Sequence, residues 1–589
     1  MPNEIYHKSN WGNANAEGFG DVYFDAAATN KLYNHSDYYE NSDGTDKILR
    51  DLSNKASIVL TPTAYSDGSL NTVIPPYQVL PTELVTNGTF DTDLSGWQIK
   101  NSDATHTVTH TSDGARFQSD TTTPIMFFET IDIILQGGKK YSLTVEIVNR
   151  NSGELKIQGN NINLFYTDNG VFTDVIEPTG NARISFYRNT SNVDITIKSV
   201  SVKEIQEADF DFSRGSSATR VNEQGLIESI ASNLPRIDYT SGFGSLKFEP
   251  QRTNLIDYSE DLTQWTSSSG IELTSSQLGV GNSNDAWKVQ RSSAYNNIFK
   301  PISFSTTSTY SIYAKKGNYS FLRIAIAGIV EQCYFDLENG TIGTTTNLIS
   351  SNIEYVNNGW YRCSMTFNNA SGTGIYIQPV ETNGGIGNSG TGHIFVQYPQ
   401  VEEGSYATSY IVSNSGSATT RSADVANNSG NADLFNDSEG VLYAEIAALA
   451  DDGTSRRISL SDASTSNTVE ILLQNTGRVD YQVKSGNSFQ GGGFFNLTQT
   501  QYNKIAVKYK TNDLALWVNG YEVSTDTSAN TPIGLSELAF DNGGGGSDFY
   551  GKTKELAVFK EALTDAELES LTSWISFTEM ATDLEYTVE

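Results

Sequence analysis

The chain has 589 residues, enough for about four domains of ~150 residues each. Its formal net charge of −31 excludes a protein that binds the nucleic-acid backbone, and no run of basic residues reverses this balance locally. No stretch reaches the ~18 apolar residues of a membrane span. The most apolar run, residues 125–135, is interrupted by Glu129 and Asp132. We therefore expect neither nucleic acid nor a membrane as a partner.

Residues 1–81 are the least regular part of the chain. The opening MPNEIYHKSNWGNANAEG has no apolar centre and no basic flank, so we expect no signal peptide and synthesis in a cytoplasm. Residues 46–55 have the spacing of a short helix, and residues 56–61 read as a strand that ends at Pro62. The aromatic content favours an attachment or oligomerisation segment over a disordered lead-in.

Residues 82–205 alternate as β-strands do. Tyr141, Leu143, Val145 and Ile147 fall on one face of a strand, with polar residues on the other. The segment, which opens with LVTNGTFDTDLSGWQI, resembles a carbohydrate-binding-module jelly roll. That resemblance implies a sandwich of two sheets.

Residues 206–250 read as a coupling hairpin followed by an extended linker. Two short strands, 218–221 and 226–227, flank a four-residue turn that ends at Gly225. Pro235 and Pro250 favour an extended chain before them. Composition alone indicates an ordered linker.

Residues 251–412 repeat the plan of residues 82–205. Trp97 precedes Tyr141 by 44 residues, and Trp265 precedes Tyr310 by 45. We interpret this as an internal duplication. Because the two tryptophans hold equivalent positions, we expect them in the cores rather than in sugar-binding sites.

Residues 413–430 are rich in Ser, Asn and Gly and read as a second linker, although SATTRSADV echoes SSATRV upstream. In residues 431–589, Asn519-Gly520 predicts a hairpin turn, and Thr564 with Glu567 predicts a capping box at a helix start. LALWVNGYEV and KELAVFKEALTDAELESL resemble the last third of a laminin-G or concanavalin-like domain.

The predicted fold class is all-β: a multidomain chain of two jelly-roll sandwiches and a laminin-G-like sandwich after an irregular N-terminal segment. The predicted divisions are residues 1–81 (attachment), 82–205 (first jelly roll), 206–250 (coupling hairpin and linker), 251–412 (second jelly roll), 413–430 (linker) and 431–589 (laminin-G-like).

The coupling stretch carries the most specific resemblance. FSRGSSATRVNEQGLIE, NLPRIDY and EPQRTNLIDYSED resemble a passage common in structural proteins of tailed bacteriophages. In those proteins the passage joins virion-attached segments to carbohydrate-binding-like β domains. ASIVLTPTAYSDGSLNTVIPP resembles the N-terminal portion of the same class.

The sequence carries no recognisable catalytic motif. A nucleophile elbow, a Walker phosphate loop, a His-Glu-x-x-His pair and the Glu-x-Asp-x-x-Glu of concanavalin-like glycosidases are all absent. His106 and His110 sit four residues apart in a strand-like run, roughly 13 Å, too far to share one zinc ion. We therefore expect a non-enzyme that requires no cofactor.

A structural Ca²⁺ is the better-grounded metal hypothesis, because jelly rolls and laminin-G-like domains often bind this ion through loop oxygens. The candidate ligands are Asp91, Asp93, Asp541 and Asp548. The alternative is that all four are solvated loop acids.

Other candidate site residues are less specific. Cys333 and Cys363 lie in strand-like runs and could face each other on neighbouring strands, or be buried free thiols. The sequence does not identify the glycan-binding residues: Tyr376, Tyr398, Trp517 and Tyr521 are candidate platforms for sugar rings, but none of them can be singled out.

The resemblance implies a structural virion protein of a tailed phage: a head fibre, a capsid decoration or a tail-associated fibre. Its expected partners are other virion proteins, further copies of itself, in such fibres often as a trimer, and host-surface polysaccharide. We expect it on the particle surface. The alternatives are a dedicated glycan-binding adhesin and a polysaccharide depolymerase; the missing signal peptide favours the virion protein over an exported adhesin.

Overall fold

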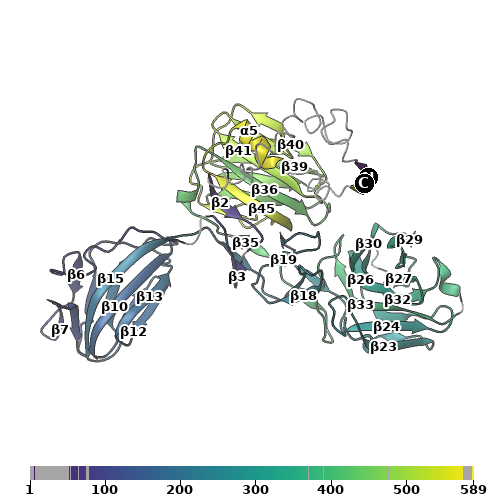
Figure 1. The fold of residues 1–589 in the computed structure, drawn as a ribbon, viewed down its shortest axis with the longest axis horizontal. Coiled ribbons are helices and arrows are strands. Elements are labelled where there is room, and N and C mark those ends of the chain that lie inside the picture. The colour runs from purple at the N-terminus through teal and green to yellow at the C-terminus, as the bar shows by residue number, and fades with distance from the viewer. Residues whose placement is uncertain are drawn as a thin grey trace, which may run out of the picture. The chain divides into compact units, whose positions relative to one another are not determined.

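The computed structural model is almost entirely β-structure, which confirms the predicted fold class (Figure 1). It describes residues 5–6, 52, 55–63, 65–74, 78–368, 371–388, 390–474, 477–574 and 587–588. The chain forms two compact units, one from residues 75–207 and the other from 1–74 together with 208–589. The predicted helix over 46–55 lies largely outside the described residues.

The unit of residues 75–207 is a two-sheet sandwich, the first sandwich, with its core between the sheets. One sheet has the order β13 (Gly170–Ile176), β10 (Tyr141–Ser152), β15 (Val193–Gln206), β8 (Gly114–Ser119), β7 (His106–Thr111). The other has the order β12 (Ile162–Tyr166), β11 (Leu155–Gly159), β14 (Ser185–Arg188), β9 (Phe127–Thr130), β6 (Trp97–Lys100). A short strand, β5 (Gln78–Val79), pairs with the end of β15, so the chain enters and leaves this sandwich at adjacent points.

The second sandwich, within the larger unit, also has two sheets. One has the order β30 (Ser350–Asn357), β31 (Trp360–Asn368), β26 (Thr307–Lys316), β33 (Gly392–Glu403), β24 (Ala286–Arg291), β23 (Ile271–Gln277). The other has the order β29 (Thr341–Thr346), β28 (Gln332–Asp336), β27 (Phe321–Ala327), β32 (Gly374–Val380), β25 (Ile298–Pro301), β22 (Thr266–Ser267).

The two sandwiches share one topology, as the predicted duplication implies. The order β13-β10-β15-β8-β7 corresponds to β31-β26-β33-β24-β23, and β12-β11-β14-β9-β6 corresponds to β28-β27-β32-β25-β22. The second copy adds two consecutive strands, β29 and β30, one at an edge of each sheet. A hairpin-like insertion between β28 and β31 is therefore the main difference between the copies.

The paired tryptophans occupy equivalent core positions, as expected. Both Trp97 and Trp265 are buried. The Trp97 Nε1 donates to the Asn87 carbonyl at 3.3 Å, and the Trp265 Nε1 donates to the Tyr258 carbonyl at 3.2 Å. Both accepting residues have a positive φ, 50° and 51°. The same local turn therefore orients the indole in each copy.

The C-terminal sandwich, the other part of the larger unit, is built on a long sheet with the order β19 (Ile237–Asp238), β20 (Ser245–Lys247), β45 (Gly551–Phe559), β36 (Glu439–Ala448), β41 (Asn503–Lys510), β42 (Leu514–Val518), β43 (Tyr521–Asp526). β2 (Ala56–Leu60) pairs with the same edge of β45 as β20 does. The facing sheet has the order β40 (Ser488–Asn496), β39 (Arg478–Ser485), β38 (Thr468–Gln474), β37 (Arg456–Ser461), β44 (Glu537–Ala539).

The stretch predicted to be a linker supplies part of this core. Phe210, Phe212, Leu246 and Phe248 are buried in the same cluster as the inward residues of both C-terminal sheets. The predicted N-terminal segment contributes too, because Leu60 belongs to that cluster. Composition suggested a linker because these hydrophobic residues are few and scattered, and their partners lie hundreds of residues away.

Short strands fasten this stretch on both sides. β16 (Phe210–Ser213) pairs with β35 (Val425–Asn427) and with β4 (Ser69–Leu70), which itself pairs with β3 (Tyr65–Ser66). β21 (Arg252–Asn254) pairs with β34 (Thr419–Arg421). The two stretches read as linkers therefore pair with each other through β16 and β35, and β34 of the second stretch pairs with β21, which begins just after the first stretch.

The predicted coupling hairpin is confirmed as β17 (Ala218–Val221) paired with β18 (Ile227–Ile230). It rests on the second sandwich. Ile227 packs on a cluster that includes Tyr313 and Trp360, on the outer side of the β26–β31 sheet. The Asn357 side-chain amide donates to the Gly225 carbonyl at 2.6 Å. The hairpin is thus docked, rather than standing free between domains.

The C-terminal helix and a nearby turn form where the sequence predicts them. α5 (Asp565–Thr572) starts with the expected capping box of Thr564 and Glu567, and Figure 1 shows it lying over β41. Asn519 and Gly520, both with positive φ, make the predicted turn between β42 and β43.

Single 3₁₀ turns occur at η2 (Leu262–Gln264), η3 (Gly385–Gly387) and η4 (Ala432–Leu434). Near the chain ends, β1 (Ile5–Tyr6) pairs in parallel with β46 (Thr587–Val588).

The two cysteines are buried free thiols in the core of the second sandwich. Cys333 lies on β28 and Cys363 on β31, so they belong to opposing sheets rather than to neighbouring strands. Burial raises the pKa of Cys333 to about 12 and that of Cys363 well above its ordinary value. Both thiols are therefore protonated and unreactive in the folded state.

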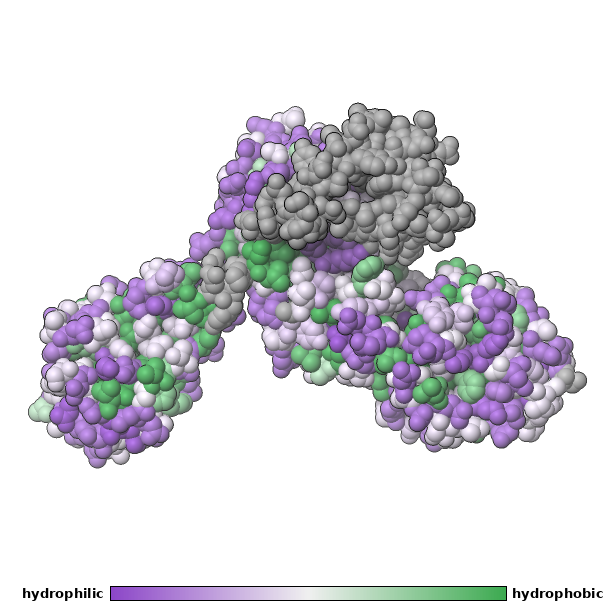
Figure 2. Space-filling view, in the orientation of Figure 1, coloured by the Kyte–Doolittle hydropathy of each residue, from purple (hydrophilic) through white to green (hydrophobic). Residues whose placement is uncertain are grey.

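Polar residues cover most of the visible surface, with hydrophobic residues in scattered groups (Figure 2). Among the described residues, no helix has the length and apolar character needed to cross a bilayer.

Candidate functional site: a cleft beside the coupling hairpin

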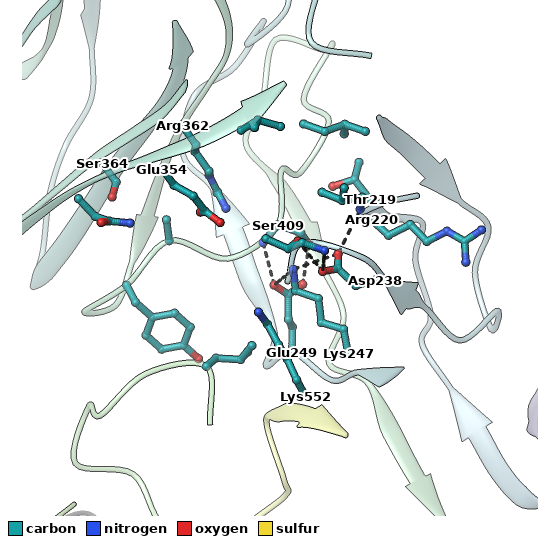
Figure 3. A pocket seen from close by; sticks show the side chains of 18 of the residues that line it. Thr219, Arg220, Asp238, Lys247, Glu249, Glu354, Arg362, Ser364, Ser409 and Lys552 are labelled. Carbon is teal, nitrogen blue, oxygen red and sulfur yellow. Dashed lines mark hydrogen bonds and ion pairs between the residues drawn. The ribbon is translucent and has the colours of Figure 1, made fainter. Parts of the chain in front are cut away.

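A cleft of about 490 Å³ opens in the larger unit where three parts of the chain meet. Its lining comes from the coupling hairpin with β19 and β20, from β30 and β31 of the second sandwich, and from β45 of the C-terminal sandwich. Figure 3 shows Glu354 and Arg362 reaching into it from one side and Lys247, Glu249 and Lys552 from the other. This volume falls in the usual range for small-ligand sites.

The wall from the second sandwich depends on its added strand. Glu354 of β30 lies directly opposite Arg362 of β31 in the strand register. Arg362 donates a hydrogen bond to the Thr408 carbonyl and lies over the Tyr313 ring, 5.5 Å from its centroid. Burial alone would lower the pKa of Arg362, but the nearby Tyr313 and Glu402 raise it. The guanidinium is therefore fixed in position as a permanent positive charge.

Two lysines face each other on the opposite side. Lys247 of β20 and Lys552 of β45 are register partners on neighbouring antiparallel strands. The Lys247 Nζ lies 3.4 Å from the Asp238 Oδ2, which also accepts from the Val221 amide at 3.1 Å. Burial would raise the pKa of Asp238, but Lys247, Thr240 and Lys552 lower it to about 2. Asp238 thus stays ionised, and its ion pair is with Lys247.

Behind the cleft lies a buried charge network of five side chains, each at most 1% exposed. Its members are Arg214, Arg236, Glu249, Arg421 and Asp424. The first three belong to the coupling stretch and the last two to residues 413–430. The network therefore holds together two segments that composition marks as linkers.

Glu249 and Asp424 are the two anions of this network, and each bridges two arginines. Glu249 Oε2 lies 2.6 Å from Arg236 Nη1 and 2.8 Å from Arg421 Nη1. Asp424 Oδ1 lies 3.0 Å from Arg214 Nη1, and its other oxygen pairs with Arg236. Burial would raise the pKa of Glu249, but Arg421 and Arg236 hold it well below its ordinary value. Removing Glu249 would leave Arg421 buried without its counter-ion, and removing Asp424 would do the same to Arg214, while Arg236 would keep one partner.

Tyrosines supply the apolar part of the lining. Tyr239, Tyr313, Tyr355 and Tyr406 border the cleft. Tyr355 is 60% exposed and packs edge-on against Tyr361, with ring centroids 5.5 Å apart. An exposed, supported ring beside polar groups is the arrangement that carbohydrate recognition uses.

The aromatic residues singled out from the sequence do not border this cleft. Tyr398 is stacked on Tyr410, with centroids 4.2 Å apart, and Trp517 is buried in the cluster beneath α5. Tyr376 packs against Phe299 on the second sandwich. The cleft residues were missed because single lysines, arginines and tyrosines spread over 330 residues carry no local pattern.

The candidate calcium ligands fall into two separate loops. In the first sandwich, Asp93 Oδ1 accepts from the Ser95 amide at 2.9 Å, and Asp91 accepts from the Thr89 hydroxyl at 2.8 Å. In the C-terminal sandwich, Asp541 is 3% exposed and accepts from the Gly543 amide at 2.6 Å. Burial raises the pKa of Asp541, and the nearby Asp548 raises it further.

These donor sets consist of oxygen, which is the chemistry that Ca²⁺ prefers. Within the described part of the chain, no group of three or more His, Cys, Asp or Glu side chains is arranged to hold a metal. Any Ca²⁺ in either loop would thus need backbone carbonyls or water for most of its coordination, and the calcium hypothesis stays a prediction.

Comparison with protein families finds one match, for residues 429–569. The matching model is described as the concanavalin A-like lectin/glucanases superfamily, and it is a laminin G type. It covers the C-terminal sandwich and less than half of the chain. No curated protein matches the chain.

Among solved structures, the chain is similar in part to the Ruminococcus gnavus IT-sialidase CBM40 bound to α2,3 sialyllactose, with 16% identity over 25% of this chain and 94% of that chain and a TM-score of 0.22. It is also similar to the CBM22-1–CBM22-2 tandem of Paenibacillus barcinonensis Xyn10C, with 10% identity over 56% and 99% of the two chains and a TM-score of 0.20. With domains LG4-5 of the mouse laminin α1 chain, the identity is 11% over 53% of this chain and 94% of that chain, and the TM-score is 0.16.

Proposed function

We propose that this chain is a non-enzymatic structural component of a tailed-phage particle, and that its cleft binds a glycan of the host surface. The observation that carries the glycan part is the cleft itself. It combines an exposed tyrosine, Tyr355, with hydroxyl, amide and charged groups over a volume of about 490 Å³. The match of residues 429–569 to a lectin-containing superfamily supports the same conclusion.

Two of the three carboxylates of the cleft, Asp238 and Glu249, are poorly suited to acid catalysis. A glycosidase needs one carboxyl group with a raised pKa to act as the acid. Asp238 and Glu249 instead have lowered pKa values and are held by Lys247 and by arginines. We therefore assign these two carboxylates as structural counter-ions and propose that the cleft serves binding. Incubation with host polysaccharide should release no reducing ends; measurable release would support a depolymerase.

The phage part of the proposal rests on the coupling stretch. The residues that carry the resemblance to phage structural proteins include Arg214, Arg236 and Glu249, which belong to the buried charge network. In this chain they join the second and C-terminal sandwiches around the cleft. Several copies on one particle would turn weak single sites into useful avidity.

Two experiments test the proposal. Cryo-electron microscopy of purified particles should place the chain on the outside of the virion, attached to other virion proteins and in several copies, as a trimer if it resembles related fibres. Particles without it would favour a separate adhesin. A glycan array probed with the purified chain should show binding that Tyr355→Ala weakens. An array without any signal would leave only the scaffold role.

We further propose a structural Ca²⁺ in the C-terminal loop that holds Asp541 and Asp548, with a second candidate at Asp91 and Asp93. A cation beside the buried Asp541 would relieve the cost of its charge. Calcium should raise the unfolding temperature of the larger unit, and chelation should lower it. Asp541→Asn should abolish this difference; an effect of calcium that survives the substitution would place the ion elsewhere.

A further inference from the structure

We propose that the cleft selects glycans that carry carboxylate groups, such as uronic or nonulosonic acids, over neutral glycans. This inference rests on the proposed glycan-binding function and names its ligand class. It follows from the charge of the cleft, which differs in sign from that of the chain as a whole.

Charge in the cleft is biased toward cations although the chain carries −31. Its charged lining residues are Arg220, Lys247, Arg362 and Lys552 against Asp238, Glu249 and Glu354, and Arg220 is paired at 2.8 Å with Glu228, which lies outside the lining. The acids are not equally available. Asp238 is held by Lys247, and Glu249 is buried between Arg236 and Arg421. Glu354 lies opposite Arg362 in the strand register, so a cation stands close to this acid as well.

Lys552 is the cation with the least compensation. Its register partner is another lysine, Lys247, and their shared counter-ion Asp238 lies within ion-pair distance of Lys247 only. Among the residues that the structure describes, no carboxylate forms an ion pair with Lys552. The Lys247 Nζ also lies 4.0 Å from the Glu249 Oε1, so both nearby carboxylates lie against Lys247. Lys552 therefore keeps a positive charge that a bound anion would stabilise.

Arg362 adds a cation on the opposite wall. Its Nη2 donates to the Thr408 carbonyl, and its Nε is buried, without solvent contact or a hydrogen-bond partner. The cleft therefore has one cation on each side, Arg362 and Lys552, and Tyr355 is among its lining residues.

The network behind the cleft strengthens this bias. Its three arginines, Arg214, Arg236 and Arg421, are balanced by only two acids, Glu249 and Asp424. Within these five side chains the cations exceed the acids by one, and a further buried acid, Glu402, is joined to Arg421 through Thr408. Fields from such buried charges are weakly screened, and a cleft focuses them toward its opening. An anionic sugar would meet this field in the cleft and repulsion elsewhere on the surface.

The test uses matched pairs of oligosaccharides. Oligogalacturonate, oligoglucuronate and oligosialate are each compared with their carboxyl-reduced forms, which keep the linkage but lose the charge. Calorimetry or fluorescence titration of the full chain should show tighter binding of at least one carboxylated member than of its reduced partner. Binding of the carboxylated form should weaken between about 0.05 M and about 0.5 M salt, because exposed charges are then screened.

Two substitutions at one position locate the effect. Lys552→Gln should weaken binding of the carboxylated member by about tenfold or more, the usual scale for a hydrogen bond to a charged group. Lys552→Arg should retain most of the affinity. Lys510→Gln, which removes a surface lysine paired with Glu439 at 2.8 Å, is the matched control and should change nothing.

The outcomes separate this inference from the function on which it rests. Equal binding of both members of every pair, or tighter binding of the reduced forms, would overturn the charge selectivity and leave glycan binding intact. Loss of affinity in Lys510→Gln as large as in Lys552→Gln would assign the effect to overall charge and overturn the assignment to the cleft. No binding to these pairs or to any glycan of an array would overturn both proposals.

Discussion

The first and second sandwiches share a strand order and a core, but they differ at one edge. In the first sandwich, β13 is the last strand of its sheet, and Val171 and Val175 on it are exposed. In the second, the equivalent strand β31 is covered by the added strand β30.

The strand registers show which residues correspond. Tyr141 pairs with Ile176 in the first copy and Tyr310 with Met365 in the second, so Thr173 corresponds to Arg362 and Val175 to Ser364. The second sandwich therefore differs from the first by polar residues on this strand and by an additional hairpin, while the two share the arrangement of the core strands. A fold can thus stay the same while one edge of it changes.

Replacement of the equivalent tryptophans tests whether the two cores depend on them to the same extent. Trp97→Ala and Trp265→Ala should each cost about 3–5 kcal/mol, because both leave a large cavity in a buried cluster. Calorimetry of the full chain should show that Trp97→Ala lowers the transition of the 75–207 unit and Trp265→Ala that of the larger unit. If either variant shifted both transitions together, the two units would not unfold independently.

The second largest expected difference in stability between the larger unit and the 75–207 unit comes from the buried charge network. Glu249→Gln leaves Arg236 and Arg421 short of a counter-ion and should destabilise the larger unit by about 3 kcal/mol, measured by urea unfolding. The 75–207 unit, which contains no part of this network, should be unaffected. The matched control is Glu439→Gln, which breaks an ion pair with a half-exposed lysine and should cost no more than about 1 kcal/mol. Similar losses in both variants would contradict a special role for burial.

Acid should weaken the larger unit through Asp238 and Glu249. Both carboxyl groups have a folded-state pKa below the unfolded one, so their stabilisation is complete above the unfolded values and is lost as pH falls through the folded values. For Asp238, a shift from 3.8 to about 2 corresponds to roughly 2 kcal/mol. Unfolding free energies of the larger unit should therefore decline from about pH 4 to pH 2, and Asp238→Asn should flatten that decline. An unchanged slope in this variant would show that other groups carry the acid sensitivity.

The smallest expected effect concerns the added strand. Tyr355→Ala should weaken glycan binding by about two- to tenfold, the scale of one aromatic contact. Its control lies on the other copy: Phe165→Ala removes a ring that is similarly exposed on the first sandwich and should leave binding unchanged. If Phe165→Ala were the more damaging change, the binding site would belong to the first sandwich instead.

Local features were predictable from the sequence because they depend on near neighbours. The β17–β18 hairpin, the Asn519-Gly520 turn and the Thr564 cap each follow from a few adjacent residues. The duplication was visible because both copies kept the spacing from tryptophan to tyrosine. The strand β30 could not be recognised as an addition without the paired registers.

The long-range pairings could not be predicted. Arg214 and Asp424 are 210 residues apart, and neither residue type is usually buried. Only the echo between SSATRV and SATTRSADV hinted that the two stretches are related, and the second of these contains Arg421 and Asp424. The cleft residues are likewise defined by the meeting of distant strands, so no local pattern marks Arg362 or Lys552.

The position of β45 has a consequence for how the chain folds during synthesis. β2, at residues 56–60, leaves the ribosome early, yet its partner β45 is made only at residues 551–559. The first sandwich needs nothing outside residues 75–207 and can close while the rest is still being translated. The C-terminal sandwich is completed last, and its early strands are exposed until then, which makes this the slow and aggregation-prone stage of folding.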